Sequence, residues 1–447
     1  MGRRSWERLF GLGLAVSAVL PFPTVASPPP APDLKPQPGS CASAEEATAP
    51  DVAITACTAI IQSKIATPAD RASASFHRGY LLAGRKEYRR AIADYTEATL
   101  YQQIVAPVAD ILVGKRQLFV AAGGSLPFGI LVTEPPAPGD GQPATLRATK
   151  WFADVHALTV IPSIQSLQFL RGGYAVKPRR GVSAPFAGYG DPLLEGEPQV
   201  SGPQGRGGRN AGSVFLPASL RSGTAIADIT QLKLSERLPG TAIEMENMRV
   251  ALGAPRESVH VQSDATEAAI KRADLAGVRV LAFATHGLMA GELPGSAEPG
   301  LVFTLPVVAS ETDDGLLTAS EISGLKLDAD WVILSACNTA AGDGTEGAPG
   351  LSGLARAFFY AGARNLLVSH WPVRDDVASR LTVETIKLQR ITPGLSRAEA
   401  LQQAMRAIRD DTSHDATGDT WAHPSAWGPF SLIGDGAQHD GVVGHSH

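Results

Sequence analysis

Five short apolar runs, separated by segments with helical periodicity, constrain the fold of this chain most. Apolar runs of this length without alternation are typical of strands that are buried on both faces of a parallel sheet. Alternation of such runs with amphipathic helices indicates an α/β fold, in which a mostly parallel sheet is flanked by helices. The runs cover residues 117–121, 156–161, 278–284, 331–334 and 365–368, and the helical segments 266–275, 351–361, 376–388 and 397–409.

Length and charge narrow the possible classes of protein. The chain has 447 residues, of which 44% are apolar, so it can bury a sizeable core and is long enough for two or three domains. Its formal net charge is -5, which offers no basic surface of the kind that dominates nucleic-acid binding. We therefore expect no nucleic-acid partner.

The first 26 residues have the layout of a secretory signal peptide. Arg3 and Arg4 form a basic start, residues 9–22 are largely apolar, and Ala26 provides a small residue at the cleavage point. Residues 27–40 are rich in proline and predict an extended linker. No later segment is apolar enough for a bilayer span. We expect an exported protein, periplasmic or extracellular, with no membrane span in the mature chain.

Residues 41–101 show the pattern of a tetratricopeptide repeat (TPR). Small and large side chains stand at the positions that such a repeat uses, but only one full repeat is visible, and solenoids need about three. The segment therefore predicts a small helical module that packs on its neighbour, with a possible protein partner as the second interpretation. The matching positions are Gly79, Leu82, Ala91, Tyr95 and Ala98.

The chain contains three cysteines, an odd number for a protein of an oxidising compartment. Cys41 and Cys57 lie in one helical segment, and we favour a disulfide between them. Cys337 is then the unpaired thiol.

Two residues with catalytic chemistry follow two of the predicted strands. His286 comes directly after the run 278–284 and Thr285, and Cys337 comes shortly after the run 331–334. Ligands bind at the carboxyl ends of strands in open α/β sheets. The two residues are about 50 positions apart, the separation typical of caspases.

Residues 102–435 resemble a CHAT domain, the caspase-like, separase-related cysteine peptidase module that is often joined to tetratricopeptide repeats. The resemblance implies a caspase-like fold. Residues 181–212 are rich in Gly and Pro and predict a flexible loop that divides the domain, and residues 436–447 are expected to form a disordered tail. The matching stretches extend over the whole domain and occur in the same order as in the family. The matching stretches are SLPFGILVTEPP, VIPSIQSL, FAGYGDP, LPGTAIEME, LAFATHG, DDGLLTASEI, WVILSACNTAAGDG, GLARAFFYAGARNLLVSHWPVRDD and HPSAWGPFSLIGDG.

The resemblance implies that Cys337 is the nucleophile and that His286 is the general base. The backbone N–H groups of Gly287 and Cys337 are the expected oxyanion donors, since a glycine beside the base lets the substrate carbonyl approach. The expected activity is cysteine-type endopeptidase activity on a protein or peptide, with no cofactor and no metal.

Related enzymes cut after a basic residue, which requires an acid in the first specificity pocket. Asp375 stands where the separase pattern places this acid, Asp376 is the second choice, and Asp343 can also contact substrate. Helix capping is the structural alternative for Asp375 and Asp376. Basic residues in or beside the loop are candidate self-cleavage sites: Arg179, Arg180, Arg206 and Arg209.

The sequence is compatible with three rival interpretations. Gly342, Gly344 and Gly347 form a G-x-G-x-x-G pattern, but it begins too far beyond the preceding strand for dinucleotide binding. The caspase-like domain can instead be a latent or inactive interaction platform whose TPR-like module recruits a partner. A redox-sensitive role for Cys337 is the third.

Overall fold

The computed structural model describes the chain in segments. These are residues 50–63, 71–121, 127–134, 142–173, 184–195, 232–288, 298–335, 353–415 and 420–436, except positions 72–73, 76, 80, 83–84, 86, 97, 311 and 372. The predicted signal peptide, linker and tail therefore lie outside the described residues. So do these individually predicted residues: Cys41, Arg179, Arg180, Arg206, Arg209, Cys337, Asp343 and the three glycines of the G-x-G-x-x-G pattern.

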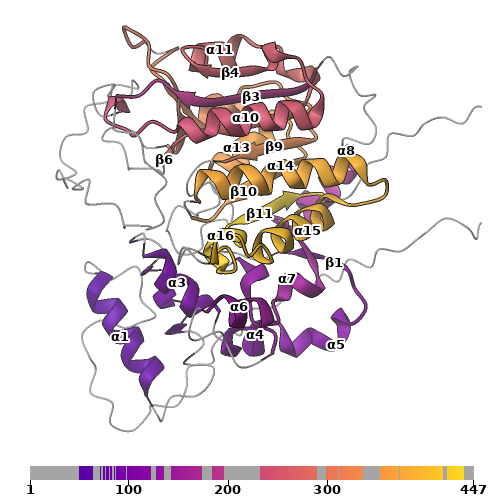
Figure 1. Cartoon of the computed structure of the whole chain (residues 1–447). Helices are drawn as coiled ribbons and strands as arrows, with labels where there is room; N and C mark the ends of the chain where they lie inside the picture. Colours follow the sequence, from indigo (N-terminus) through magenta and orange to yellow (C-terminus); the bar gives the residue numbers. More distant parts are fainter. Residues whose placement is uncertain are drawn as a thin grey trace, which may run out of the picture.

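An eight-stranded sheet organises the described part of the chain, in the order β1-β2-β11-β10-β9-β5-β3-β4 (Figure 1). Neighbouring strands are parallel except at β10 and β11, which are antiparallel. The mostly parallel sheet expected from the sequence is confirmed. The strands are β1 (Gln117–Val120), β2 (Ala157–Val160), β3 (Ala184–Pro192), β4 (Val259–Gln262), β5 (Val278–Ala284), β9 (Trp331–Leu334), β10 (Asn365–Ser369) and β11 (Phe430–Gly434).

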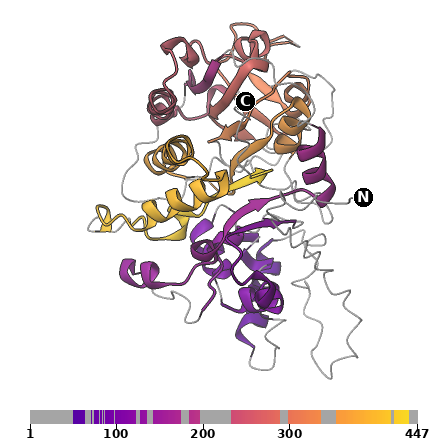
Figure 2. The ribbon, with the colours of Figure 1, turned by 90° about the vertical axis from the view of Figure 1, so that its right-hand side faces the viewer.

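Helices cover both faces of this sheet, as Figure 2 shows from the side. On the face toward the viewer in Figure 1 lie α10 (Pro239–Leu252), α14 (Asp375–Ile391) and α15 (Arg397–Arg409). On the other lie α11 (Glu267–Arg272), α12 (Ala319–Ser323) and α13 (Gly353–Ala361). In β5, Ala282 and Ala284 pack with the first layer, and Leu281 and Phe283 pack with the second. Burial on both faces explains the unalternating apolar runs.

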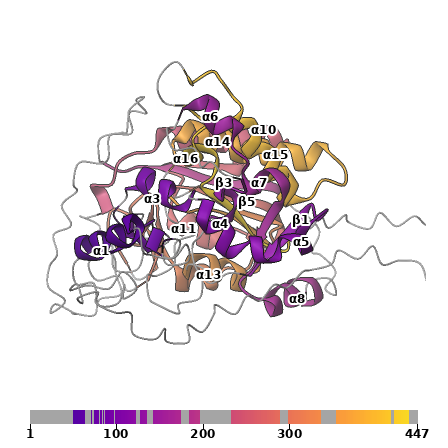
Figure 3. The same ribbon diagram turned by 90° about the horizontal axis from the view of Figure 1, so that it is seen from below.

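The N-terminal helices pack against the end of the sheet domain (Figure 3). Leu82 and Tyr95 belong to the same buried cluster as Trp151 and Trp427. Gly79 lies against the ring of Tyr95, where a β-carbon would come within 2.7 Å of it. These helices and the short connecting ones are α1 (Pro50–Gln62), α3 (Tyr88–Tyr95), α4 (Ala98–Ile104), α5 (Ala109–Leu112), α6 (Pro143–Ala148), α7 (Phe152–Val155), α8 (Ile164–Gly173) and α16 (Pro424–Trp427).

Cys57 is fully buried in α1 and takes part in a disulfide. Both other cysteines lie outside the described residues, so pairing with Cys41 stays a prediction. Within the described segments, no helix is long and apolar enough to cross a membrane.

The predicted loop over residues 181–212 is wrong for Ala184–Pro192, which forms strand β3 between β4 and β5. The glycines that favoured a loop have another cause. A β-carbon on Gly188 would come within 2.7 Å of Met245 Sδ on α10, so the strand needs glycine where the helix crosses it closely. The rest of that loop lies outside the described residues, apart from Leu193–Glu195.

A second, small antiparallel sheet stands beyond the end of β5. It consists of β6 (Gly287–Leu288), β7 (Gly300–Val302) and β8 (Leu316–Thr318). Its first strand begins directly after His286.

Gly362 links α13 to β10 and gives a test of the fold. Its φ of +116° is unfavourable for other residues, and a β-carbon would clash with the carbonyl oxygen of Leu327. We expect Gly362→Ala to lower the free energy of unfolding by about 3 kcal/mol. Gly394→Ala is the matched control, because Gly394 has a φ of +83° but open space around it, and should cost about 1 kcal/mol. Equal losses in urea unfolding would contradict the close packing at Gly362.

Candidate functional site

The two strands that precede His286 and Cys337 are neighbours in the sheet. Phe283 of β5 pairs with Leu334 of β9 in parallel register, and the Ser335 N–H donates to the Phe283 carbonyl at 2.9 Å. The strands that lead to His286 and Cys337 therefore end side by side at one edge of the sheet. Cys337 itself lies outside the described residues, so its pairing with His286 stays a prediction.

The small sheet holds the backbone around His286. The Thr285 hydroxyl donates to the Val302 carbonyl, and the Val302 N–H donates to the His286 carbonyl at 2.9 Å. Gly287 is opposite Leu301 and follows a hydrogen-bonded pair, so its own N–H points away from β7. This direction leaves the Gly287 N–H available to another acceptor, as an oxyanion donor requires.

A backbone carbonyl orients the His286 ring. His286 Nε2 lies 2.6 Å from the carbonyl oxygen of Glu236. Because a carbonyl oxygen only accepts hydrogen bonds, Nε2 carries the proton, and Nδ1 of the neutral ring has a free lone pair. A base needs such a lone pair. Sequence reasoning missed Glu236, because a backbone contact leaves no signal in the residue type.

Asp375 lies at the start of α14, close enough to His286 for an electrostatic interaction. The side chain is half-buried, and its carboxylate packs on Gly240, where a β-carbon would come within 2.5 Å of Oδ2. Burial and the neighbouring Asp376 raise the pKa of Asp375, and His286 opposes this shift. Within the described residues Asp375 has no hydrogen-bond donor. An incoming cation would supply the missing partner.

Asp376 has a different role from Asp375. Its carboxylate accepts two hydrogen bonds from Arg374, at 3.0 and 2.6 Å, and one from the Val377 N–H at 2.8 Å. Partial burial opposes the charge, but the bonds from Arg374 prevail and lower the pKa of Asp376. Asp376 therefore stabilises the start of the helix. Asp375 is the one of the two that has no hydrogen-bond donor within the described residues.

Glu244 is a fully buried acid behind the site. Its Oε1 lies 2.8 Å from the Thr382 hydroxyl of α14, and burial raises its pKa to about 7, although the Thr382 and Ser335 hydroxyls oppose the shift. The Thr382 hydroxyl also lies 2.9 Å from the Ala378 carbonyl. The Thr382 hydroxyl has one proton. It can therefore donate to the Ala378 carbonyl only if Glu244 is protonated and donates a hydrogen bond to the hydroxyl oxygen. Glu244 thus connects α10, α14 and the end of β9.

Sequence reasoning missed Glu244 as well. The signal was present, since Glu244 falls with Thr241, Met245 and Met248 on the buried side of α10. A carboxyl on an apolar helix face is rarely left without a partner.

His370 and Trp371 follow β10 at the same edge of the sheet. Burial lowers the pKa of His370 to about 4, and its Nε2 lies 2.8 Å from the Ser431 hydroxyl. The Trp371 ring is buried and donates to the Ser425 carbonyl at 3.1 Å. A neutral, partly buried imidazole beside a packed tryptophan forms a wall rather than a second base.

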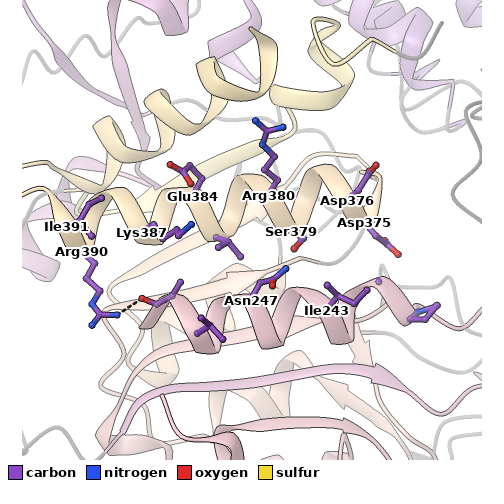
Figure 4. Close-up of a pocket in the computed structure, with 15 residues that line it drawn as sticks. Ile243, Asn247, Asp375, Asp376, Ser379, Arg380, Glu384, Lys387, Arg390 and Ile391 are labelled. Atoms are coloured by element: carbon purple, nitrogen blue, oxygen red, sulfur yellow. Dashed lines mark hydrogen bonds between the residues drawn. The ribbon is translucent and has the colours of Figure 1, made fainter. Parts of the chain in front are cut away.

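A groove of about 1110 Å³ runs between α10 and α14 (Figure 4). Asp375 and Asp376 line one end, and Arg390 and Ile391 line the other. No cluster of potential metal ligands occurs among the residues that the structure describes. The groove gives access to Asp375 from the outer surface of the helices.

The buried proton of Glu244 predicts a dependence of stability on pH. An unfolded glutamate titrates near 4.5, whereas folded Glu244 titrates near 7. The folded state therefore retains a proton that the unfolded state releases, and this contribution to stability is lost as the pH rises from about 4.5 to about 7. Glu244→Gln removes the effect. We expect the free energy of unfolding of the variant, relative to wild type, to rise by about 3 kcal/mol between pH 5 and pH 8.

The measurement is urea unfolding at intervals across that range. Glu384→Gln, the same substitution at a partly exposed position of α14, is the control for losing a carboxyl group. A relative stability of Glu244→Gln that does not change with pH would contradict the buried proton.

Two curated proteins and one solved structure are among the matches to this chain. Tetratricopeptide repeat protein 28 of Mus musculus is 36% identical over 119 residues and that of Homo sapiens is 34% identical over 119 residues; each match covers 27% of this chain. This chain spans only 4% of the length of either relative. The solved complex of the RgpB pro- and mature domains of Porphyromonas gingivalis gives a TM-score of 0.36 at 10% identity, covering 78% of this chain and 77% of that one.

The family comparison covers most of the chain. The model of the CHAT domain family matches residues 96–435, which include every strand of the large sheet, His286, Glu244 and Asp375. The chain belongs to the CHAT domain family.

Proposed function

We propose that this protein is an exported cysteine endopeptidase in which Cys337 is the nucleophile and His286 is the general base. The observation that carries the proposal is the orientation of His286. Its Nε2 proton is committed to Glu236, so Nδ1 is free to accept a proton, at the end of the strand that pairs with the one leading to Cys337. Membership of the CHAT domain family supports the same assignment.

In the proposed reaction, Nδ1 of His286 takes the thiol proton of Cys337. The sulfur attacks the scissile carbonyl carbon, and the oxyanion accepts hydrogen bonds from the N–H groups of Gly287 and Cys337. Collapse of this intermediate breaks the C–N bond, and His286 protonates the leaving amine. Water, activated by the same imidazole, then hydrolyses the thioester and restores the thiol.

Asp375 is the proposed acid that selects an Arg or Lys side chain before the scissile bond. It is half-buried, near His286 and without a donor in the described residues. A bound guanidinium or ammonium would stabilise the negative charge of Asp375 and lower its pKa. Cleavage at Arg179, Arg180, Arg206 or Arg209 of the same chain would follow from this preference.

The catalytic assignment predicts the labelling pattern of an affinity probe. We expect a peptidyl-Arg acyloxymethylketone to modify Cys337 of the purified mature chain. Cys337→Ala should abolish the label, because the attacking sulfur is removed. His286→Ala should slow labelling by about 10² to 10⁴-fold, because base catalysis is removed. Intact-mass and peptide mass spectrometry identify the modified residue.

Ser413→Ala is a suitable control, because Ser413 is an exposed residue in the turn after α15. Absence of labelling in folded wild type would refute an active peptidase and favour a latent or inactive interaction platform. Labelling that is equally fast in His286→Ala would refute the role of His286.

The specificity assignment predicts the effect of neutralising Asp375. We expect Asp375→Asn to lower kcat/KM for an Arg substrate by about a hundredfold, because the substrate cation loses its counter-charge in a partly buried site. An otherwise identical substrate with Gln at that position should change by less than about threefold on the same grounds. Loss of Arg selectivity in Asp376→Asn instead would assign the specificity to Asp376.

A further inference from the structure

Asp191, at the carboxyl end of β3, is a buried charge in an unusual backbone conformation. Its exposed fraction is 2%, and its φ is +44°. The pairing of β3 with β4 also shifts register between Gly190 and Pro192. Non-glycine residues in the left-handed region are uncommon, and they persist where the surroundings hold them. Gly190 pairs with Ala284 of β5, so Asp191 stands next to the strand end that leads to His286.

Two sets of hydrogen bonds connect Asp191 to the segment that enters α10. Its N–H donates to the Thr241 hydroxyl at 2.7 Å, and that hydroxyl donates to the Leu238 carbonyl at 2.7 Å. Both of its carboxylate oxygens accept from Arg237 Nη2, at 3.0 and 2.7 Å. The backbone and the side chain of one residue therefore hold residues 237–241 in place.

The residue directly before Arg237 is Glu236, whose carbonyl accepts the Nε2 proton of His286 at 2.6 Å. The Asp191–Arg237 ion pair thus fixes the peptide segment that orients the proposed base. A buried ion pair is generally a weak source of stability, since desolvation offsets the attraction. The Asp191–Arg237 pair is well suited to hold the Glu236 carbonyl in one position.

We propose that Asp191 is a positioning residue for His286, acting through Arg237 to hold the Glu236 carbonyl against Nε2. This inference rests on the proposed function, in which His286 is the base. Loss of the ion pair lets the carbonyl move. The imidazole then samples the tautomer with its proton on Nδ1, and in that form it cannot accept the thiol proton.

The test is the tautomer of His286, measured by NMR on the full mature chain labelled with ¹⁵N-histidine and assigned with His286→Gln. In wild type at a pH where the ring is neutral, we expect the Nε2–H tautomer. In Asp191→Asn, the ¹⁵N shifts should move toward a mixture of both tautomers. Asn suits this test, because it tolerates the left-handed conformation and removes only the charge.

The Asp191→Asn variant should lose turnover rather than substrate binding. We expect kcat for a peptidyl-Arg substrate to fall between about tenfold and about a hundredfold in Asp191→Asn, because misplacing a catalytic group by about 1 Å has an effect of this size. KM should stay within about threefold by the same reasoning. Arg237→Lys should retain more of kcat than Arg237→Gln, since a lysine retains the charge but not the planar fork.

Asp328→Asn is the matched control. Asp328 pairs with the buried Arg364 at the opposite edge of the sheet, before β9 and β10. The Asp328→Asn substitution should lower the stability of the fold without changing the tautomer of His286. If Asp191→Asn does not fold, Arg237→Gln replaces it, because the Arg237 side chain is 31% exposed and glutamine removes the charge of the ion pair.

Unchanged His286 ¹⁵N shifts in a folded Asp191→Asn or Arg237→Gln protein would overturn the positioning role. A shift in tautomer in these variants, with no probe labelling or hydrolysis by wild type, would support the positioning role and refute the proposed peptidase function. The NMR readout does not depend on activity, so the two failures are distinguishable.

Discussion

The parallel pairing of β5 with β9 is the constraint on which the rest of the site depends. Both strands are buried on both faces between two helical layers. A slip of one residue would move every side chain to the wrong layer, so burial fixes the register. Phe283 is therefore held beside Leu334, and the chain must leave the two strands at the same edge. The small sheet β6–β7–β8 then sets the direction in which His286 departs.

Burial also shifts the pKa values of titratable groups at the carboxyl-end edge of the sheet. Burial raises the pKa values of Glu244 and Asp375 and lowers that of His370, because each group is more stable in its neutral form away from water. Asp191 retains its charge partner, Arg237, in the same region. The packing that fixes the strand register thus also controls the charge of Asp375, which interacts with His286.

Much of the fold could be predicted from the sequence. The five apolar runs correspond to β1, β2, β5, β9 and β10, and the segment 397–409 is α15 to the residue. The glycines of β3 predict a loop, but in the structure they accommodate the close crossing of α10. Strands β4 and β11 were also not predicted, and the antiparallel entry of β11 into the sheet arises from long-range pairing that no local pattern encodes.

The sequence by itself determined which strands are buried and that His286 and Cys337 follow two of them. It also determined that Asp375 begins a helix. These features follow from the sequence because hydrophobic pattern and chain order are local properties. Only the tertiary structure decided that β5 and β9 are neighbours, that the Glu236 carbonyl receives the Nε2 proton of His286, and that Asp191 pairs with Arg237. These contacts join residues about 50 positions apart. They depend on how helices and strands pack in three dimensions, and a backbone carbonyl has no side-chain identity for a sequence to reveal.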